Sequence, residues 1–532
     1  MYKVLVSDKL GQAGIDILTE ASDIDLTIET GLDEAGLINI IGDFEALIIR
    51  SGTKATSELL QAAKKLRVVG RAGVGVDNVD IEAATRKGVI VMNTPAANTI
   101  ATAELAMALI LASARNIVPS HNSTANGEWR RSEFAGTELR GKVLGIAGFG
   151  RVGRAVAERA KAFDMKVHVY DPYISESVGR ELGVEIMDLI EVLATCDYLS
   201  LHSVLNDETR YLINSERLAM MKKGSVLINV ARGGLIDEKA VAESLENGNL
   251  KIAAIDVFSS EPPTPDNPLL NNPNVIHTPH LGASTAEAQR DVAIDVANQV
   301  LDALRGDKIT NCVNLDFSSS IGFDRVAPYI ELSEKMGLLQ AAMADGPITS
   351  VEIEVISDES EDLVKPVAAG LLKGLMTESH EGRLNYVNAP MLGQENGLEI
   401  TRSQGIGDGR SNSATCKVKW DGGERIVSGK VYDGSVQRIV RISGYRFEAA
   451  PEGTVLLMLN DDVPGVVGAV GSKLGELGIN IAEWRLGRDL ERNEALSYIN
   501  LDNSPTGSDL EQISELEKVR KAVVIEMSKG AT

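Results

Sequence analysis

The stretch of the chain that decides its fold reads GKVLGIAGFGRVGRAVAERAKAFDMKVHVYDP and spans residues 141–172. It contains three glycines at the spacing G-x-G-x-x-G: Gly148, Gly150 and Gly153. A short apolar run (143–147) precedes the glycines, and a helix-forming segment (154–162) follows them. A second apolar run (167–170) ends in Asp171, about twenty residues beyond the glycines, as a dinucleotide-binding βαβ unit requires.

Each part of this pattern has a physical role in binding a dinucleotide. The first two glycines allow backbone N–H groups at a helix N-terminus to approach a pyrophosphate, and the third allows the helix to pack on the strand. Asp171 can accept hydrogen bonds from a ribose 2′-hydroxyl and would repel a 2′-phosphate. We therefore predict NAD as the cofactor, with Arg151 and Val152 among the contacts of the turn. A purely structural turn between strand and helix is the alternative.

The composition of the chain bounds its class and its partners. At 532 residues the chain is too long for a single core, and 44% hydrophobic with 24% charged residues is typical of globular proteins. A formal net charge of −23 disfavours nucleic acid and anionic membranes as partners, and no apolar run approaches the length of a membrane span. The cysteines (Cys196, Cys312 and Cys416) are too scattered for a metal-ligand pair or a disulfide framework. We expect no metal site and a reducing, cytoplasmic location.

Short apolar runs that alternate with helix-compatible segments predict an α/β fold with two doubly wound, Rossmann-like lobes. The strands expected in the first lobe are 3–7, 46–49, 68–72 and 89–92. Those expected in the nucleotide-binding lobe beyond the fingerprint are 198–201, 226–230, 252–255 and 275–277. We expect a buried helix over 100–113 and a long helix over 283–305 that crosses back to the first lobe. One lobe inserted in the other predicts a cleft at the carboxyl ends of the strands.

Three residues near predicted strand ends carry complementary chemistry. Arg232 in NVARGG can grip a carboxylate with its planar guanidinium, and His280 in HTPHLGAST can accept a proton near neutral pH. Glu261 in AIDVFSSEP can orient that imidazole and favour its protonated form. Together they meet the needs of a 2-hydroxyacid dehydrogenase. The structural alternatives are a surface ion pair for Arg232, packing at a strand end for His280 and turn formation for Glu261.

With these motifs the chain closely resembles the D-isomer-specific 2-hydroxyacid dehydrogenase family over nearly its whole length. The shared motifs are IIRSGT from residue 48, VVGRAGVGVDNVD from 68, NTPAANTIATAE from 93, the glycine fingerprint, NVARGGLIDE from 229 and TPHLGAST from 278. The resemblance implies hydride transfer from C2 of the substrate to the nicotinamide of NAD. It also implies that His280 accepts the proton, that Glu261 is its partner, and that Arg232 binds the substrate carboxylate.

The resemblance implies further contacts to cofactor and substrate. The remaining cofactor positions are Ser203, Val204, Val230, Asp256, His280 and Gly282, with Asp256 near the nicotinamide carboxamide. The positions that imply a phosphorylated substrate are Arg50, Ser51, Arg71, Val74 and Asn98. Arg131 resembles an arginine that reaches the site of a neighbouring subunit. Converging arginines would hold a phosphate dianion, although surface charges at strand ends are the alternative for Arg50 and Arg71.

The chain departs from the family at residues 202–205. The family often has His-Thr-Pro-Leu or a close variant there, whereas this chain has His-Ser-Val-Leu. The loss of proline removes a rigid turn but leaves the backbone and a hydroxyl, so we expect altered affinity for NAD without loss of binding.

Beyond about residue 314 the character of the sequence changes. A linker-like stretch (315–322) precedes alternating segments at 351–356 and 414–420, and the glycine-rich run 403–413 indicates a hairpin or loop. The block to about residue 452 resembles the α+β intervening domain of long-form members of the family. Arg438 and Arg446 are its candidate anion ligands, and a structural spacer is the alternative.

The last segment, TVLLMLNDDVPGVVGAVGSKLGELGINIAEWRLGR from residue 454, predicts strand, turn, helix (466–477) and strand. A strand (494–500) and a helix (510–517) follow, which gives the ferredoxin-like order βαββαβ. The Asp-x-Pro-Gly turn resembles an ACT domain, a regulatory sensor of amino acids that usually pairs edge to edge. The positions that match contacts to effector serine are Asn460, Asp462 and Asn480. A dimerising domain without a ligand is the alternative.

These observations combine into one predicted organisation and activity. The predicted domains are a substrate lobe (1–99 and 284–314), an NAD-binding lobe (100–283), an intervening domain (315–452) and an ACT domain (453–532). The predicted reaction is NAD-dependent oxidation of D-3-phosphoglycerate in the first step of phosphorylated serine biosynthesis, by a homodimer or homotetramer inhibited by L-serine. The alternatives are a related oxidoreductase acting on 2-oxoglutarate or hydroxypyruvate, and a non-catalytic NAD-sensing interaction protein.

Overall fold

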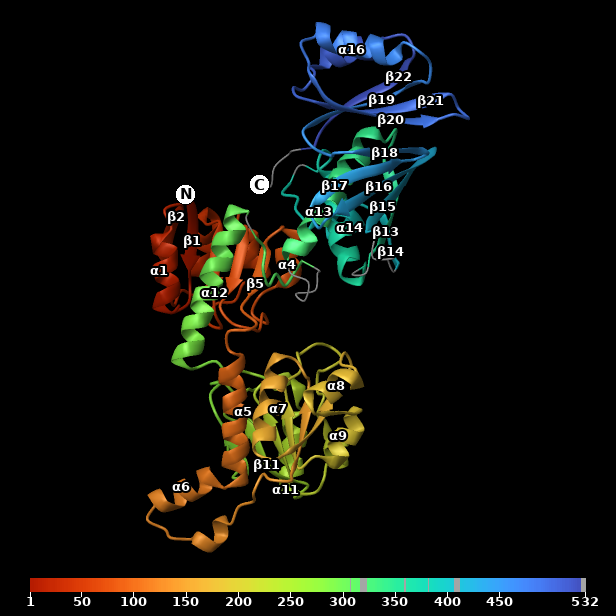
Figure 1. Ribbon diagram of the computed structural model, residues 1–532. Helices are drawn as coiled ribbons and strands as arrows, with labels where there is room; N and C mark the ends of the chain where they lie inside the picture. The colour runs from red at the N-terminus through yellow and green to blue at the C-terminus, as the bar shows by residue number, and fades with distance from the viewer. Residues whose placement is uncertain (307, 316–322, 358–359, 381, 406–411, 528–532) are drawn as a thin grey trace. The chain divides into compact units, whose positions relative to one another are not determined.

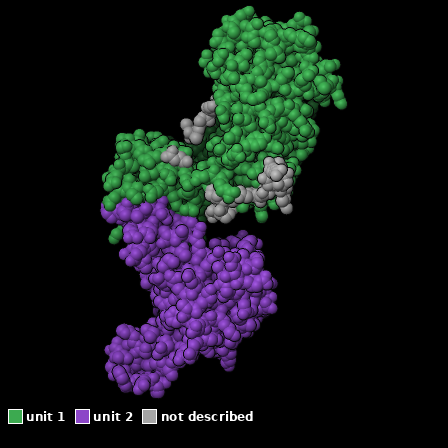
Figure 2. All heavy atoms as spheres, viewed as in Figure 1, with its two compact units in different colours: residues 1–9, 16–93, 296–532 green, residues 10–15, 94–295 purple. Residues whose placement is uncertain are grey.

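The computed structural model describes residues 1–306, 308–315, 323–357, 360–380, 382–405 and 412–527. They form two compact units, one of residues 1–9, 16–93 and 296–532 and the other of residues 10–15 and 94–295 (Figure 2). Most of the expected linker and the middle of the glycine-rich run lie outside the described residues.

The amino-terminal part of the first unit is a five-stranded parallel sheet in the order β2-β1-β3-β4-β5 (Figure 1). Its strands are β1 (Tyr2–Val6), β2 (Ile24–Ile28), β3 (Ala46–Ile49), β4 (Val68–Arg71) and β5 (Ile90–Asn93). The connecting helices are α1 (Gln12–Glu20), α2 (Glu34–Ile40), η1 (Ile41–Asp43), α3 (Ser57–Ala62) and α4 (Ile81–Arg86). The four expected strands are confirmed. Sequence reading missed β2 because the apolar residues of this edge strand alternate with polar ones and form no continuous apolar run.

The second unit contains a seven-stranded parallel sheet in the order β12-β11-β10-β9-β6-β7-β8, the doubly wound arrangement predicted from the glycine fingerprint. Its strands are β6 (Val143–Ala147), β7 (Lys166–Tyr170), β8 (Glu185–Ile186), β9 (Tyr198–Leu201), β10 (Ser225–Asn229), β11 (Leu250–Ile255) and β12 (Val275–His277). The chain order reverses between β6 and β9, the point at which such sheets bind nucleotides.

Helices on both faces cover this sheet. They are α5 (Thr99–Ala114), α7 (Arg151–Ala162), α8 (Glu176–Leu182), α9 (Leu189–Thr195), α10 (Ser215–Met220), η3 (Gly233–Leu235) and α11 (Glu238–Glu246). The expected apolar helix is α5, whose buried residues belong to the core of the unit. After α5 come α6 (Ile117–Ala125) and η2 (Arg131–Phe134), and α12 (Ala286–Arg305) begins three residues later than expected. Among the described residues no single helix is long and apolar enough to cross a membrane, although the bent pair of α5 and α6 jointly reaches that length and composition.

The middle of the first unit has an α+β structure with a six-stranded sheet in the order β14-β13-β15-β16-β17-β18. Its strands are β13 (Ile348–Ile356), β14 (Glu399–Gly405), β15 (Ser413–Trp420), β16 (Gly423–Tyr432), β17 (Val436–Ile442) and β18 (Tyr445–Ala449). Its helices are α13 (Phe323–Met343), α14 (Ser360–Met376) and α15 (Ala389–Glu395). Helices α13 and α14 pack backbone to backbone, since a Cβ added at Gly370 or Gly374 would overlap carbonyl oxygens of α13.

The carboxyl-terminal part of the first unit has the predicted order βαββαβ and an antiparallel sheet in the order β20-β21-β19-β22. Its elements are β19 (Thr454–Asp461), α16 (Val466–Glu476), β20 (Ile481–Asp489), β21 (Glu494–Leu501), α17 (Gly507–Ser514) and β22 (Val519–Glu526). One face, with Leu456 and Ile499, packs with α16 and α17. The other face, with Leu457 and Tyr498, joins the core of the preceding sheet and helices. The second helix lies about three residues before its predicted position.

Candidate active site

The three glycines of the fingerprint differ in what surrounds them. At Gly148, with φ of +97°, an added Cβ would lie 2.6 Å from the backbone of both His202 and Ser203. At Gly153 it would overlap the carbonyl oxygen of Gly148, so this glycine lets α7 pack closely on β6. At Gly150, the N-cap of α7, no atom lies within 4 Å of the added Cβ. The outer glycines therefore serve backbone packing, and the middle one leaves open the space that a pyrophosphate needs at the helix N-terminus.

Asp171 follows β7 and organises the loops beside the fingerprint. Its Oδ2 accepts a hydrogen bond of 2.7 Å from the amide of Phe149, and its Oδ1 accepts one of 2.9 Å from the amide of Tyr173. An ionised carboxylate has about four acceptor positions, so positions remain for the hydroxyls of a ribose. The residues at this edge of the sheet thus fit NAD, and the helix there begins at Arg151 with Val152 in its first turn.

The segment after β9, residues 202–205, departs from the family sequence, but its backbone is still anchored. The hydroxyl of Ser203 donates to the carbonyl oxygen of Ala147 over 3.1 Å, whereas the side chain of Val204 is 73% exposed. His202 is partly buried, with its Nε2 2.8 Å from the hydroxyl of Ser200, and desolvation lowers the pKa of His202 to about 4. A neutral His202 therefore lies behind Gly148, a supporting role that the sequence reading did not assign.

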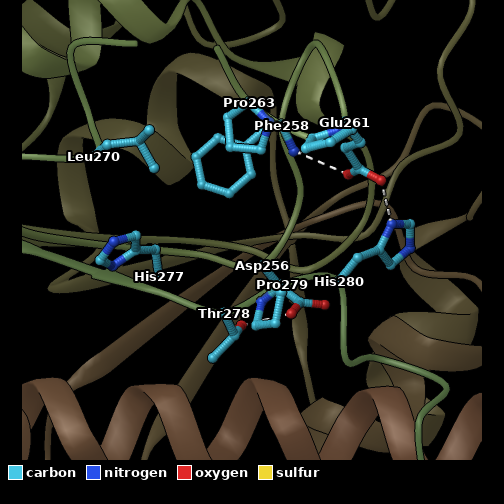
Figure 3. A pocket seen from close by; sticks show the side chains of 10 residues that line it. Asp256, Phe258, Glu261, Pro263, Leu270, His277, Thr278, Pro279 and His280 are labelled. Carbon is cyan, nitrogen blue, oxygen red and sulfur yellow. Dashed lines mark hydrogen bonds and ion pairs between the residues drawn. The ribbon is translucent and has the colours of Figure 1, made fainter. Parts of the chain in front are cut away.

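His280 and Glu261 form a hydrogen-bonded pair at the ends of β12 and β11 (Figure 3). His280 Nδ1 lies 2.6 Å from Glu261 Oε2, and the amide of Phe258 donates to Glu261 Oε1 over 3.0 Å. Burial raises the pKa of Glu261, but the hydrogen bonds from His280 and Phe258, with the charges of His280 and Arg232, outweigh it and hold that pKa below its ordinary value. Glu261 is thus an ionised carboxylate that fixes the imidazole and leaves Nε2 for a substrate.

A buried carboxylate holds the turn that carries His280. Asp256 is fully buried, and its Oδ1 accepts from the Thr278 hydroxyl over 2.5 Å and from the Leu281 amide over 2.7 Å. Its Oδ2 accepts from the amide of Gly282 over 3.0 Å. Because His280 has φ of +56°, a conformation that costs energy for a residue with a side chain, these bonds compensate for local strain.

Arg232 follows β10 and lies within the electrostatic reach of the pair. The buried Asn229 donates from Nδ2 to the Arg232 carbonyl oxygen over 2.9 Å and accepts from the Ala231 amide over 3.1 Å, which fixes the turn. A Cβ at Gly233 would overlap the backbone of Phe258, so this turn touches the loop that leads to Glu261. The predicted trio of Arg232, Glu261 and His280 therefore comes together at the carboxyl ends of three adjacent strands. Val230, at the same strand end, is buried.

A cavity of about 510 Å³ borders the pair. Its lining is mostly apolar and comprises Asp256, Phe258, Glu261, Pro262, Pro263, Leu270, His277, Thr278, Pro279 and His280. Figure 3 shows Phe258, Pro263 and Leu270 along one side and His277, Thr278 and Pro279 along the other. The pair therefore lies at the wall of a hollow whose surface is mostly apolar, and both of its side chains remain partly exposed to solvent.

In the first unit, four predicted substrate residues share one edge of the sheet. Arg50 and Ser51 follow β3, and Arg71 ends the neighbouring β4, where it is paired with Ile49. The carbonyl oxygen of Val74 accepts a hydrogen bond of 2.5 Å from Asn93 Nδ2 at the end of β5. These residues therefore lie at the carboxyl ends of neighbouring strands, as predicted.

Two further predicted substrate residues lie in the second unit. Asn98 is the N-cap residue of α5, and its buried Oδ1 accepts no hydrogen bond from the described residues. Arg131 lies exposed in η2 and makes no ion pair with the described residues, whereas its neighbour Arg130 is bonded to Glu128 and Glu133. The Oδ1 of Asn98 thus lacks a donor, and the guanidinium of Arg131 is exposed to a ligand or a partner.

The predicted effector residues have partners of their own. The amide of Asn460 donates to the Asp461 carbonyl oxygen, Asp462 pairs with Arg488 over 2.7 Å, and Asn480 donates to Asp502 over 2.6 Å. Arg438 lies on β17 opposite Lys430 of β16, and Arg446 lies on β18 opposite Arg441. Cations directly opposite one another on neighbouring strands repel, which an anion at this place would relieve.

Comparisons with known proteins agree with this geometry. A family model for the NAD-binding domain of D-isomer-specific 2-hydroxyacid dehydrogenases matches residues 107–282, and one for the D-3-phosphoglycerate dehydrogenase intervening domain matches residues 325–443. The D-3-phosphoglycerate dehydrogenase of Methanocaldococcus jannaschii is 39% identical over 528 residues, 99% of this chain and all of the relative. That of Bacillus subtilis is 37% identical with the same coverage.

Solved structures resemble the two α/β lobes. The TT0316 protein of Thermus thermophilus is 36% identical with a TM-score of 0.55, and the match covers 58% of this chain and 99% of that one. The D-lactate dehydrogenase of Aquifex aeolicus, solved with NAD and lactic acid, is 28% identical with a TM-score of 0.53, covering 57% and 96%. With full-length relatives, two matching domains and a shared fold, the chain belongs to the D-isomer-specific 2-hydroxyacid dehydrogenase family and, within it, to the D-3-phosphoglycerate dehydrogenases.

Proposed function

We propose that this protein oxidises D-3-phosphoglycerate to 3-phosphohydroxypyruvate with NAD, the first step of phosphorylated L-serine biosynthesis. The observation that carries the proposal is the His280–Glu261 pair, with Arg232 nearby, in a fold whose glycine fingerprint fits NAD. Full-length identity of 37% to 39% to D-3-phosphoglycerate dehydrogenases supports the choice of substrate.

The site residues divide the work of the oxidation. Bound NAD supplies the acceptor for the hydride that leaves C2 of the substrate. His280 Nε2 accepts the proton of the C2 hydroxyl, because Nδ1 is held by Glu261. The ionised Glu261 stabilises the imidazolium that results, and Arg232 holds the substrate carboxylate.

The cofactor is held by backbone and carboxylate groups of the second unit. Gly148, Gly150 and Gly153 form the pyrophosphate turn with Arg151 and Val152, and Asp171 takes the ribose hydroxyls. Ser203, Val204 and Val230 lie at neighbouring strand ends on the adenosine and nicotinamide path. Asp256 Oδ2 has one bond from Gly282 and room for a second donor, such as a carboxamide N–H.

The phosphate and carboxylate of the substrate are held by arginines and backbone groups. Arg50, Ser51, Arg71 and Val74 supply these contacts from one sheet edge, and Asn98 adds an amide whose Oδ1 has no donor among the described residues. Arg131 completes the site of a neighbouring subunit in a homodimer or homotetramer. Trp129, two residues before Arg131, is 85% exposed, which supports this role because tryptophan is enriched at interfaces.

The carboxyl-terminal βαββαβ part is a regulatory ACT domain that binds L-serine through Asn460, Asp462 and Asn480. Serine would compete with the internal partners of these residues, Arg488 and Asp502 among them. Arg438 and Arg446 would bind an anionic effector where cross-strand cations face one another.

The protein would work in a reducing cytoplasm, which its three free cysteines support.

The test is NADH formation by the purified protein with D-3-phosphoglycerate. It is run beside unphosphorylated D-glycerate, the reduced form of hydroxypyruvate, and beside 2-hydroxyglutarate, the reduced form of 2-oxoglutarate. A strong preference for the phosphorylated acid is the expected result. Preference for another 2-hydroxy acid would replace the substrate assignment but keep the mechanism. NAD binding without turnover on any of these acids would contradict an enzymatic role and favour an NAD-sensing protein.

A further inference from the structure

The loop Arg50–Thr53, which follows β3 in the first unit, is shaped from one side by a carboxylate. Asp8 lies two residues beyond β1, and its Oδ2 accepts hydrogen bonds from the amides of Arg50 over 2.6 Å and Thr53 over 3.0 Å. A Cβ at Gly52 would lie 2.5 Å from Asp8 Oδ1, so a larger residue at position 52 would displace the carboxylate. The amides at both ends of the loop therefore share one acceptor oxygen.

An amide shapes the same loop from the other side. Asn78 Nδ2 donates to the carbonyl oxygens of Arg50 and Thr53, each over 2.6 Å. The backbone of Asn78 is fixed in turn, because its own carbonyl oxygen accepts from the amide of Ala55 over 2.8 Å. Two side chains from distant parts of the sequence thus satisfy all four backbone polar groups of the residues that begin and end the loop.

The middle of the loop is left open by this arrangement. Ser51 and Gly52 are exposed, and their amides donate to no acceptor among the described residues. The guanidinium of Arg50, the residue that begins the loop, donates from Nη1 to the Lys9 carbonyl oxygen over 3.1 Å. The loop thus combines a cation with two unbonded amides, which are groups that bind anions.

We propose that Asp8 and Asn78 are positioning residues that preform the Arg50–Thr53 loop for the substrate phosphate. The inference rests on the proposed function, because that function assigns Arg50 and Ser51 to the substrate. The two side chains act through the backbone of the loop and touch no reacting atom. Without them, the loop would have to be ordered when the substrate binds, and affinity would fall by the cost of that ordering.

The experiment compares steady-state kinetics of variants in the intact enzyme. Asn78→Asp replaces the donor by an acceptor that faces two carbonyl oxygens, and Asp8→Leu removes the acceptor but keeps the branching of the side chain. We expect each to raise the KM for D-3-phosphoglycerate about tenfold or more with a smaller change in kcat. The dissociation constant for NADH, measured by fluorescence, should not change because the fingerprint belongs to the other unit.

Matched variants separate this role from a general loss of structure. Asp8→Asn keeps an oxygen that can accept both amides and should keep KM within about threefold of the parent. Asn39→Asp makes the same charge change at an exposed position of α2 and should have no effect. Asn78→Ser, a smaller change, serves if Asn78→Asp does not fold.

Each outcome decides a different question. An unchanged KM in folded Asn78→Asp or Asn78→Ser and in Asp8→Leu would overturn the positioning role. A fall in kcat at constant KM would overturn it as well, since it would place the effect on the chemical step. Failure of the parent enzyme to prefer the phosphorylated acid would instead contradict the proposed function.

Discussion

The two loops that bear the proposed chemistry are built alike but finished differently. In the second unit Asp256 gathers the Thr278 hydroxyl and two amides and fixes the turn that carries His280. In the first unit Asp8 gathers two amides of the Arg50–Thr53 loop. The turn of His280 ends in a complete hydrogen-bonded pair. The Arg50–Thr53 loop instead leaves two amides and the charge of Arg50 available to a ligand. With the proposed function, the acid–base pair would be assembled before substrate arrives, whereas the phosphate-binding loop would complete its contacts only with its ligand.

This comparison predicts that changes in the turn of His280 act on kcat and changes in the Arg50–Thr53 loop act on KM. The largest effect is expected for His280→Ala, which should lower kcat by about two to four orders of magnitude because the general base is lost. Binding of NADH should survive, because the fingerprint is untouched. His277→Ala is the matched control, since His277 lines the same cavity without contacting Glu261. Near-normal turnover by His280→Ala would remove this residue from the mechanism.

Glu261→Gln should lower kcat about ten- to a hundredfold, because the imidazolium loses its negative partner. Binding of NADH should not change, because the fingerprint is untouched. A kcat close to that of the parent would contradict this account of the pair.

The lowered pKa of Glu261 also predicts the sign of a stability effect. A carboxyl whose pKa is lower in the folded protein stabilises the fold above its ordinary pKa, and this contribution is lost as the pH falls through the lowered value. Urea unfolding in this acid range should therefore depend less on pH in Glu261→Gln than in the parent. An equal slope in both proteins would contradict the shift.

Thr278→Val tests whether the buried anchor matters to the turn of His280. The substitution keeps the shape of the side chain but removes the donor to Asp256, and we expect kcat to fall about tenfold because the turn loosens. Thr278→Ser keeps the hydroxyl and should retain most of the activity. Equal kcat in the two variants would show that packing, and not the hydrogen bond, fixes the turn.

The sequence could predict what depends on local pattern. Apolar runs and glycine spacing predicted the fingerprint and the strands of both α/β sheets except the edge strands β2 and β8. The starting point of α7 differed because Gly150 caps the helix. The strand ends also brought Arg232, Glu261 and His280 together, since parallel strands share one carboxyl edge. The site residues themselves have no test beyond this geometry and stay predictions.

What the sequence could not predict depends on contacts between distant residues. Asp8 and Asn78 bond to Arg50 from 42 and 28 positions away in the sequence. No periodic pattern in the sequence predicts either hydrogen bond. The support of Gly148 by the backbone of His202 is equally non-local. Edge strand β2 escaped notice because its exposed residues give a weak apolar signal. Such anchors become visible only when the fold supplies the neighbours.

The smallest effect on catalysis is expected outside both loops, at Asn480 of the carboxyl-terminal part. Asn480→Ala removes a hydrogen bond to Asp502 between exposed groups, so stability should change by less than about 1 kcal/mol. Inhibition by L-serine should be lost, while kcat and KM without serine stay near those of the parent. Asn503→Ala changes a nearby exposed asparagine and should leave inhibition intact. If serine inhibits Asn480→Ala as strongly as the parent, the serine site lies elsewhere. If serine inhibits neither the variant nor the parent, the carboxyl-terminal part does not sense serine. The comparison of the two loops would then describe an enzyme without inhibition by serine.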